Sequence, residues 1–125
     1  FKKIENADYK LIIKKGHYFS RIHVYDIAKL IVKGMHESSD NKVWNVSDQE
    51  PASHEDFIRE AIKIGNFSQI EEVNYEEIKS NMPENSRSFW ESNKRVLGKK
   101  ILKDLNTSLV FPNYKQGLRS IFFSQ

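Results

Sequence analysis

The sequence predicts a mixed α/β fold, or an α+β arrangement if the segment is taken by itself. Short runs rich in β-branched and aromatic residues alternate along the chain with stretches whose apolar residues recur at helical spacing. The 125 residues are enough for one domain with a modest core. Because no internal repeat, low-complexity segment or linker divides the chain, residues 1–125 are expected to form a single unit.

The first elements expected are two short strands followed by a helix. Strands are predicted at 9–14 and 19–24, with a turn at Gly16 between them. The second strand leads into a helix that starts near Asp26, a residue type that favours the N-cap position. This helix has one broad apolar arc, which is formed by Ile27, Ala28, Leu30, Ile31 and Met35.

A break, a third strand and a second helix come next. The polar stretch 38–41 ends the first helix, and the compact run KVWNV at 42–46 is predicted to be a strand. Ser53 heads the second helix with Asp56 three residues later, which is a variant of the capping box. The apolar residues of this helix lie on one side, and the Gly-Asn pair at 65–66 closes it.

The last third of the chain continues the alternation of strands and helices. In order, the expected elements are a strand at 70–75, a helical turn at 76–79, a polar loop at 80–88, a helix from about 93 to 105, a strand at 107–111 and a terminal helix at 114–123. The helix at 93–105 is amphipathic, and its apolar face consists of Leu97, Ile101, Leu102 and Leu105.

Several kinds of site are excluded by residue type and spacing. The five glycines are too far apart for a dinucleotide fingerprint or a P-loop, so no cofactor-binding residue is assigned in this chain. The histidines lack zinc-ligand spacing and cysteine is absent, so no metal site and no thiol catalysis are expected. The lack of cysteine and of a long apolar run fits a cytoplasmic protein.

Two tyrosine–lysine pairs have the spacing of an acid/base device. Tyr25–Lys29 and Tyr75–Lys79 would each place both side chains on one face of a helix. A neighbouring ammonium lowers the pKa of a phenol, and short-chain dehydrogenases use such a pair to move protons. Because the spacing occurs twice in so short a chain, both pairs are interpreted as coincidental, and no catalytic residue is assigned.

Two groups of basic residues are candidates for binding anions. Arg87 lies in the polar loop beside Phe89 and Trp90, where a guanidinium and an aromatic wall could hold a phosphate or a carboxylate. The helix at 93–105 carries a second group, in which four of the five residues share one arc opposite the leucines. Its members are Lys94, Arg95, Lys99, Lys100 and Lys103.

Three blocks together resemble the C-terminal part of extended short-chain dehydrogenases, the NAD(P)-dependent epimerase/dehydratase family. They are FSRIHVYDIA, WNVSDQEPAS and SFWESNKRVLGKKILKDLNTSLVFPNYKQGL, in the order and spacing of that family, over residues 19–118. In the third block Asn93, Lys94, Leu105 and Gly117-Leu118 occupy motif positions, whereas Asn106 stands where the family often has glycine. In the first block Asp26 matches a structural helix cap of the family.

The resemblance implies the substrate-side part of a longer enzyme, an oxidoreductase or isomerase that uses NAD or NADP. The cofactor and the catalytic tyrosine–lysine pair would belong to an N-terminal Rossmann half upstream of this sequence. Nucleotide-sugar members of the family place an arginine where this chain has Phe19, and Arg21 follows two residues later. Arg21, Arg87 and Trp90 are therefore the residues expected to contact a sugar or nucleotide-sugar-like substrate.

Two functions remain open from the sequence alone. In the first, the segment is inactive by itself, docks against the missing Rossmann half, and in its absence exposes part of the first helix and self-associates. In the second, the segment is an autonomous basic module that binds nucleic acid or phosphorylated ligands through the face from Lys94 to Lys103.

Overall fold

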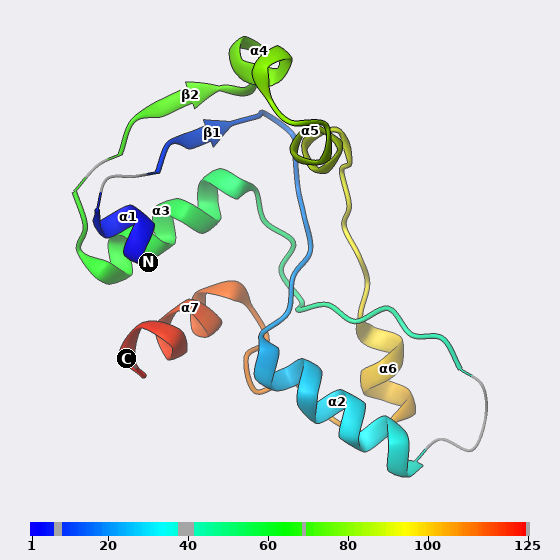
Figure 1. The fold of residues 1–125 in the computed structure, drawn as a ribbon. Coiled ribbons are helices and arrows are strands. Elements are labelled where there is room, and N and C mark those ends of the chain that lie inside the picture. Colours follow the sequence, from blue (N-terminus) through cyan, green and yellow to red (C-terminus); the bar gives the residue numbers. More distant parts are fainter. Residues whose placement is uncertain (7–8, 38–41, 69, 125) are drawn as a thin grey trace.

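The computed structural model describes residues 1–6, 9–37, 42–68 and 70–124. Figure 1 shows two groups of elements, one built around a small sheet and the other around a long helix. In chain order, the elements are α1 (Lys2–Glu5), β1 (Leu11–Ile13), α2 (Val24–Glu37), α3 (His54–Gly65), β2 (Glu72–Asn74), α4 (Tyr75–Ile78), the 3₁₀ turn η1 (Lys79–Asn81), α5 (Glu84–Glu91), α6 (Lys99–Asp104) and α7 (Tyr114–Phe123). The break expected at 38–41 lies outside the described residues.

The small sheet consists of β1 and β2, which pair in parallel with Leu11 opposite Glu72. Both strands were predicted, at 9–14 and 70–75, and both are confirmed in shortened form. A parallel pair needs a long crossover, and here that crossover includes α3, which packs on both β1 and α7. The core of this group is formed by Ile4, Leu11, Ala52, Ile58, Ala61, Tyr114 and Leu118.

The ends of α3 match the sequence prediction. The hydroxyl oxygen of Ser53 accepts a hydrogen bond from the backbone N–H of Asp56 at 3.0 Å, so Ser53 is the N-cap. Asn66 ends the helix in the left-handed conformation with φ of 50°, which asparagine tolerates better than most residues do. Ile58 and Ala61 are the buried residues of the predicted apolar side.

The second group of elements packs α2 against α6 and the loops around them. Its core consists of Leu30, Ile101, Leu105 and Leu109, with Ile22, Trp44 and Leu102 packed against it. The predicted apolar arc of α2 is therefore only partly used. Leu30 is buried, whereas Ile27, Ile31 and Met35 are exposed.

Asp26 has a different role from the predicted N-cap. The helix already begins at Val24, and Asp26 lies in its first turn with no exposed surface. Its two carboxylate oxygens accept hydrogen bonds from the backbone N–H groups of Val110, at 2.8 Å, and Phe111, at 2.9 Å. Asp26 thus fixes a distant loop instead of starting its own helix.

Three predicted strands, at 19–24, 42–46 and 107–111, are wrong within the described residues. The first contributes only an isolated antiparallel bridge between Phe19 and Ala52. The last is held by the side chain of Asp26 in place of a neighbouring strand. The segment 42–46 forms no strand, and Val43 in it is 92% exposed. Apolar patterning indicated burial at these segments, but a strand also requires a partner.

The predictions for residues 80–105 also need correction. The expected polar loop at 80–88 contains the end of η1 and the first half of α5, so Arg87 lies on a helix. The third helix is much shorter than predicted, because α6 begins only after Gly98. A Cβ at position 98 would lie 2.6 Å from the backbone oxygen of Ser47, and this close approach requires glycine. Leu97, placed on the apolar face by the sequence, precedes the helix and is exposed.

Candidate functional site

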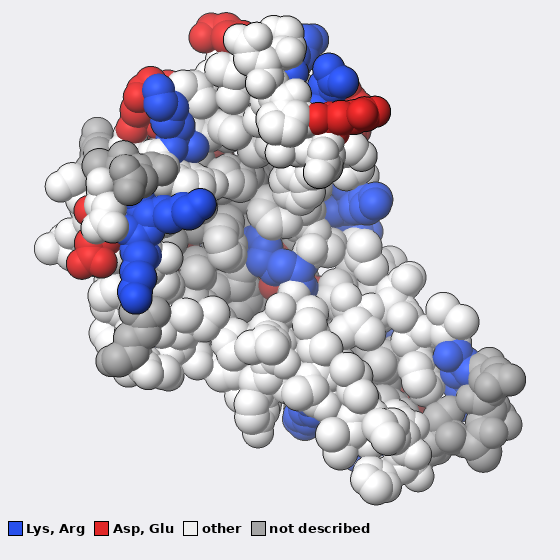
Figure 2. Space-filling view, in the orientation of Figure 1, with Lys and Arg blue, Asp and Glu red and all other residues white. Residues whose placement is uncertain are grey.

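The candidate site is built around Arg21, which lies between the two groups of elements. Its Cζ lies 3.9 Å from the ring centre of Phe19, 4.5 Å from that of Phe57 and 5.1 Å from that of Tyr114. Nη2 donates to the carbonyl oxygen of Ala52 at 3.1 Å. An aromatic cage of this kind stabilises a cation through the negative faces of its rings. Figure 2 shows basic and acidic side chains together in the hollow between the two groups.

The acidic partner of the cage is Asp48, which is buried. The backbone N–H of Asp48 donates to the carbonyl oxygen of Arg21 at 2.6 Å, and this bond holds the two segments together. Burial raises the pKa of the Asp48 carboxyl, and the bond from the N–H of Glu50 and the charge of Arg21 oppose that shift. Burial also lowers the pKa of Arg21, against the opposing charge of Asp48. Each ion therefore partly compensates the desolvation of the other.

A second aromatic cluster adjoins the cage through Phe19. The ring of His54 lies 6.3 Å from that of Phe19 and 5.0 Å from that of Trp90. The hydroxyl of Tyr9 and Nε2 of His54 share a hydrogen bond of 2.6 Å. His17 is buried at the same place, with its ring 5.1 Å from Trp90. Two of the three predicted site residues, Arg21 and Trp90, are thus joined through Phe19 and His54.

The partly buried His54 is expected to make the stability of the protein depend on pH. Burial lowers the pKa of His54 below its ordinary value of 6.5, so the unfolded chain binds a proton at this residue more readily than the folded one. We expect His54 to stabilise the fold fully above pH 6.5, and this contribution to be lost as pH falls through the lowered pKa. The measurement is the urea unfolding midpoint from pH 7.5 to 5.

The His54→Gln variant is the control for this pH dependence. It should show a flatter slope of unfolding free energy between pH 7 and 5, because it removes the titrating group. Asp48 acts in the opposite direction, since its raised pKa favours the folded state as acid is added. An unchanged slope in His54→Gln would assign the pH dependence to another group.

Arg87 lies apart from the cage and the cluster. Its side chain faces Glu91 on α5, with Nε 3.9 Å from the carboxylate oxygen. It lines a separate open hollow of about 630 Å³ together with Lys79, Ser80, Glu84, Ser88 and Glu91. Phe89 and Trp90 belong to the aromatic cluster on another side of α5. Its predicted contact with the substrate stays a prediction.

Sequence reasoning missed Asp48, His54 and Tyr114 as members of the site. His54 occupies the first position of α3 and Asp48 lies in a loop, so no spacing along the chain connects them with Arg21. The sequence did place two of the residues that line one cavity close together. Arg21 and His23 are two residues apart, and both face the same cavity.

Neither tyrosine–lysine pair is assembled as an acid/base device. Nζ of Lys29 donates to the carbonyl oxygen of Ser108 at 2.9 Å, whereas the ring of Tyr25 lies edge-on to Phe111. Tyr75 is buried, and Lys79 forms an ion pair with Glu76 at 2.6 Å. The interpretation of both spacings as coincidental stays a prediction.

The basic group on the predicted third helix is divided in the structure. Lys94 and Arg95 precede α6, and the guanidinium of Arg95 stacks 3.8 Å above the ring of Tyr18. Lys100 pairs with Asp104. The continuous helical face that a phosphate-binding module would need is therefore absent from the described residues.

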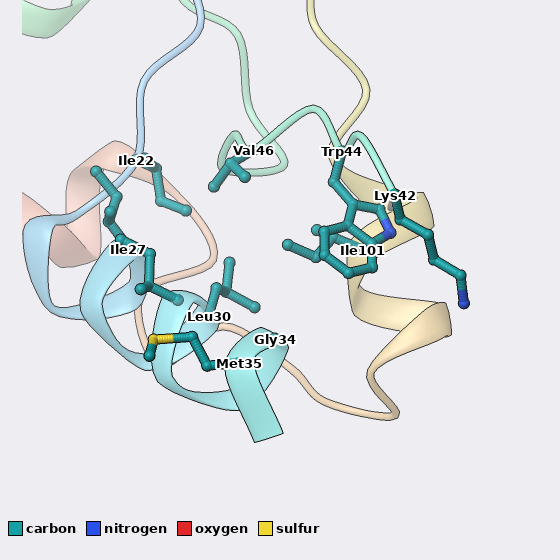
Figure 3. Close-up of a pocket in the computed structure, with 10 residues that line it drawn as sticks. Ile22, Ile27, Leu30, Gly34, Met35, Lys42, Trp44, Val46 and Ile101 are labelled. Atoms are coloured by element: carbon teal, nitrogen blue, oxygen red, sulfur yellow. The ribbon is translucent and has the colours of Figure 1, made fainter. Parts of the chain in front are cut away.

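A second hollow, of about 580 Å³, lies between α2 and the segment 42–46. Figure 3 shows Ile27, Leu30 and Met35 of α2 facing this space, with Trp44 and Val46 on the opposite side and Ile101 of α6 at its end. Figure 2 shows few charged side chains over α2. An exposed apolar patch of this kind is typical of a surface that another polypeptide covers.

Comparisons with known proteins give a fold but no family. No protein-family model and no curated protein matches the chain. A solved structure described as a functionally unknown conserved protein from Silicibacter pomeroyi DSS matches 93% of this chain, with 34% identity and a TM-score of 0.85. The crystal structure of the human epimerase family protein SDR39U1 with NADPH matches 99% of the chain, with 13% identity and a TM-score of 0.83.

The chain spans 41% of the bacterial protein and 42% of the human one. The mixed α/β fold predicted from the sequence is confirmed, and it is consistent with a segment of an epimerase-family fold.

Among the described residues, no helix combines the length and the apolar character needed to cross a membrane. No group of three or more acidic, histidine or cysteine side chains suited to a metal ion occurs among them either.

Proposed function

We propose that this chain is the substrate-binding portion of an NAD(P)-dependent epimerase/dehydratase-like oxidoreductase and is inactive by itself. The observation that carries the proposal is the caged arginine, Arg21, which lies within a fold shared with an epimerase-family protein that holds NADPH. In this proposal Arg21 and the aromatic rings around it orient the substrate. Trp90 supports the cage indirectly, because it packs against His54, which in turn lies against Phe19. Arg87 contacts a more distant part of the substrate.

The cofactor would be bound by another part of the parent enzyme, because the residues described here do not fit a dinucleotide site. The glycines are widely spaced, and neither tyrosine–lysine pair is assembled. The proposal therefore assigns hydride transfer, the catalytic pair and the choice between NAD and NADP to an N-terminal Rossmann half. This chain supplies the opposite wall of the substrate cleft, on which a nucleotide-sugar-like molecule would lie.

The exposed apolar face of α2 supports the proposal that a Rossmann half packs against this chain. Its exposed apolar residues adjoin the segment 42–46, which has strand-like composition and forms no strand within the described residues. A Rossmann half would cover the helix and pair with this segment at the edge of its sheet. The share of the two solved structures that this chain leaves unmatched is large enough for such a half.

The test begins with the coding sequence upstream of Phe1. We expect it to encode a strand, a glycine-rich turn with a helix, and a tyrosine–lysine pair. The joined chain should then bind NADPH, measured by the change in nicotinamide fluorescence, and the 125-residue chain should not. Tight binding of NADPH by the 125-residue chain would overturn the division of labour proposed here, and so would a joined chain that does not bind it.

Without its partner, the chain is expected to self-associate through α2. Ile31 and Met35 are exposed, Met35 by 78%, and burying such a surface against a second copy is favourable. The double variant Ile31→Glu/Met35→Glu should lower the apparent mass in sedimentation velocity to that of a monomer. Leu97→Glu is the matched control, since Leu97 is 74% exposed outside α2. A wild-type chain that stays monomeric at high concentration would contradict this expectation.

A further inference from the structure

The structure contains a cavity lined by Arg21 and His23, whose side chains include buried nitrogen atoms with no hydrogen-bond partner among the described residues. It has a volume of about 180 Å³, well above the roughly 10–15 Å³ that one water molecule requires. Arg21 and His23 line it from the chain that leads into α2, and Asp48 lines it from the neighbouring loop. The remaining wall is largely apolar and includes Phe57, Phe111, Leu118 and Ile121.

Arg21 brings unused hydrogen-bond donors to this cavity. Its Nη2 donates to carbonyl oxygens, but Nε and Nη1 are buried without a hydrogen-bond partner in the described part of the chain. A guanidinium has five N–H donors, and leaving them unpaired away from water is costly. The aromatic cage compensates the charge from the ring faces and leaves the edges of the guanidinium for an acceptor.

His23 brings a further donor, and its tautomer follows from its contacts. Nδ1 accepts a hydrogen bond from the backbone N–H of Tyr25 at 3.2 Å, so in the neutral ring the proton is on Nε2. Nε2 is buried and has no hydrogen-bond partner among the described residues. The ring is held in place by Phe111, whose centre lies 4.1 Å away, and by Gly117.

The unpaired groups of Arg21 and His23 are therefore all donors, which selects a ligand rich in acceptors. The negative charges of Asp48, Asp56 and Glu50 all act on the single positive charge of Arg21, so a dianion such as phosphate would meet more repulsion than a monoanion. The apolar wall suits a short hydrocarbon body.

From this arrangement we propose that the cavity binds the carboxylate of a small organic acid, with Arg21 and Nε2–H of His23 donating to its oxygens. The inference rests on the proposed function only in that the acid would be the substrate or a part of it. Binding itself requires no cofactor. It therefore can be tested, and can fail, independently of NADPH binding by the joined chain.

The probe is isobutyrate, titrated into the 125-residue chain while the side-chain ¹H–¹⁵N signals of Arg21 and His23 are followed by NMR. Isobutyramide, which has the same shape without the charge, and inorganic phosphate are the comparison ligands. We expect saturable shifts of both side chains with isobutyrate, weaker binding of phosphate and no saturation with isobutyramide.

Two variants complete the experiment. His23→Asn keeps a good N-cap residue at the start of α2 but removes Nε2, and should weaken isobutyrate binding about tenfold or more. Arg59→Gln, an exposed arginine on α3 that pairs with Glu55 and does not line the cavity, should bind as the wild type does. The proposal is overturned if isobutyrate leaves both side chains unshifted, if isobutyramide or phosphate binds as tightly, or if His23→Asn binds like Arg59→Gln. The titrations of the wild-type chain with the three ligands test the proposal even if a variant fails to fold.

Discussion

Replacing Asp26 with asparagine is expected to lower the free energy of unfolding by about 3 kcal/mol. Both carboxylate oxygens of Asp26 accept backbone N–H groups, from Val110 and Phe111, and the side chain has no exposed surface. An asparagine can offer only one oxygen, and its NH₂ group would face the second N–H. The variant therefore loses one charge-assisted bond, weakens the other and leaves a buried donor unpaired.

The measurement is urea denaturation combined with amide hydrogen exchange. The exchange rates of the Val110 and Phe111 amides should rise more than those of α3, because the lost bonds are local to that loop. Glu84→Gln, an exposed change in the first turn of α5, is the matched control and should alter stability by less than about 1 kcal/mol. Wild-type stability in Asp26→Asn would mean that water or neighbouring groups replace the carboxylate without loss.

Asp26 also shows what the sequence could and could not predict about the fold. Its residue type suggested a cap for its own helix, which is a contact between near neighbours. The actual partners are more than eighty residues away, and no local pattern identifies them. The cap of α3 by Ser53 and its closure at Asn66 were predictable, because all the groups involved lie within a few residues of one another.

The failed strand at 42–46 has a related cause. Its compact run of β-branched and aromatic residues favoured a strand, but strand formation depends on a neighbouring chain that accepts and donates hydrogen bonds. The helix predicted at 93–105 failed for a different reason. The close approach of Gly98 to Ser47 fixes the backbone before α6, and this tertiary contact overrides the helical spacing of the leucines.

Of the residues that form the aromatic cage and its acidic partner, only Arg21 was predicted from the sequence. Arg21 was identified because it follows the family position at Phe19 by two residues, and it does lie in a buried, aromatic-lined place. Asp48 and Tyr114 come from loops and helices that meet only in the folded chain. Arg87 was chosen for its aromatic neighbours in the sequence, but on α5 those neighbours point to another side.

Replacing Trp90 with alanine is expected to destabilise the protein by about 3–5 kcal/mol. The ring is only 5% exposed and contacts His17, His54, Tyr75 and Phe89, with ring centres between 5.0 and 5.8 Å apart. Removing it would leave a cavity where α3, α4 and α5 meet the loop that carries His17. Phe89→Ala is the control, since Phe89 is 43% exposed and its loss should cost about 1 kcal/mol.

A third variant, Trp90→Phe, separates a supporting role of Trp90 from a direct contact with the substrate. A ligand cannot reach a ring that is almost fully covered unless the aromatic cluster opens. Trp90→Phe, which keeps most of the packing, should therefore retain isobutyrate binding at Arg21 and lose about 1–2 kcal/mol of stability. If Trp90→Phe instead folds with wild-type stability and loses binding, the indole itself contacts the ligand, and the cluster around His54 opens when the site is occupied.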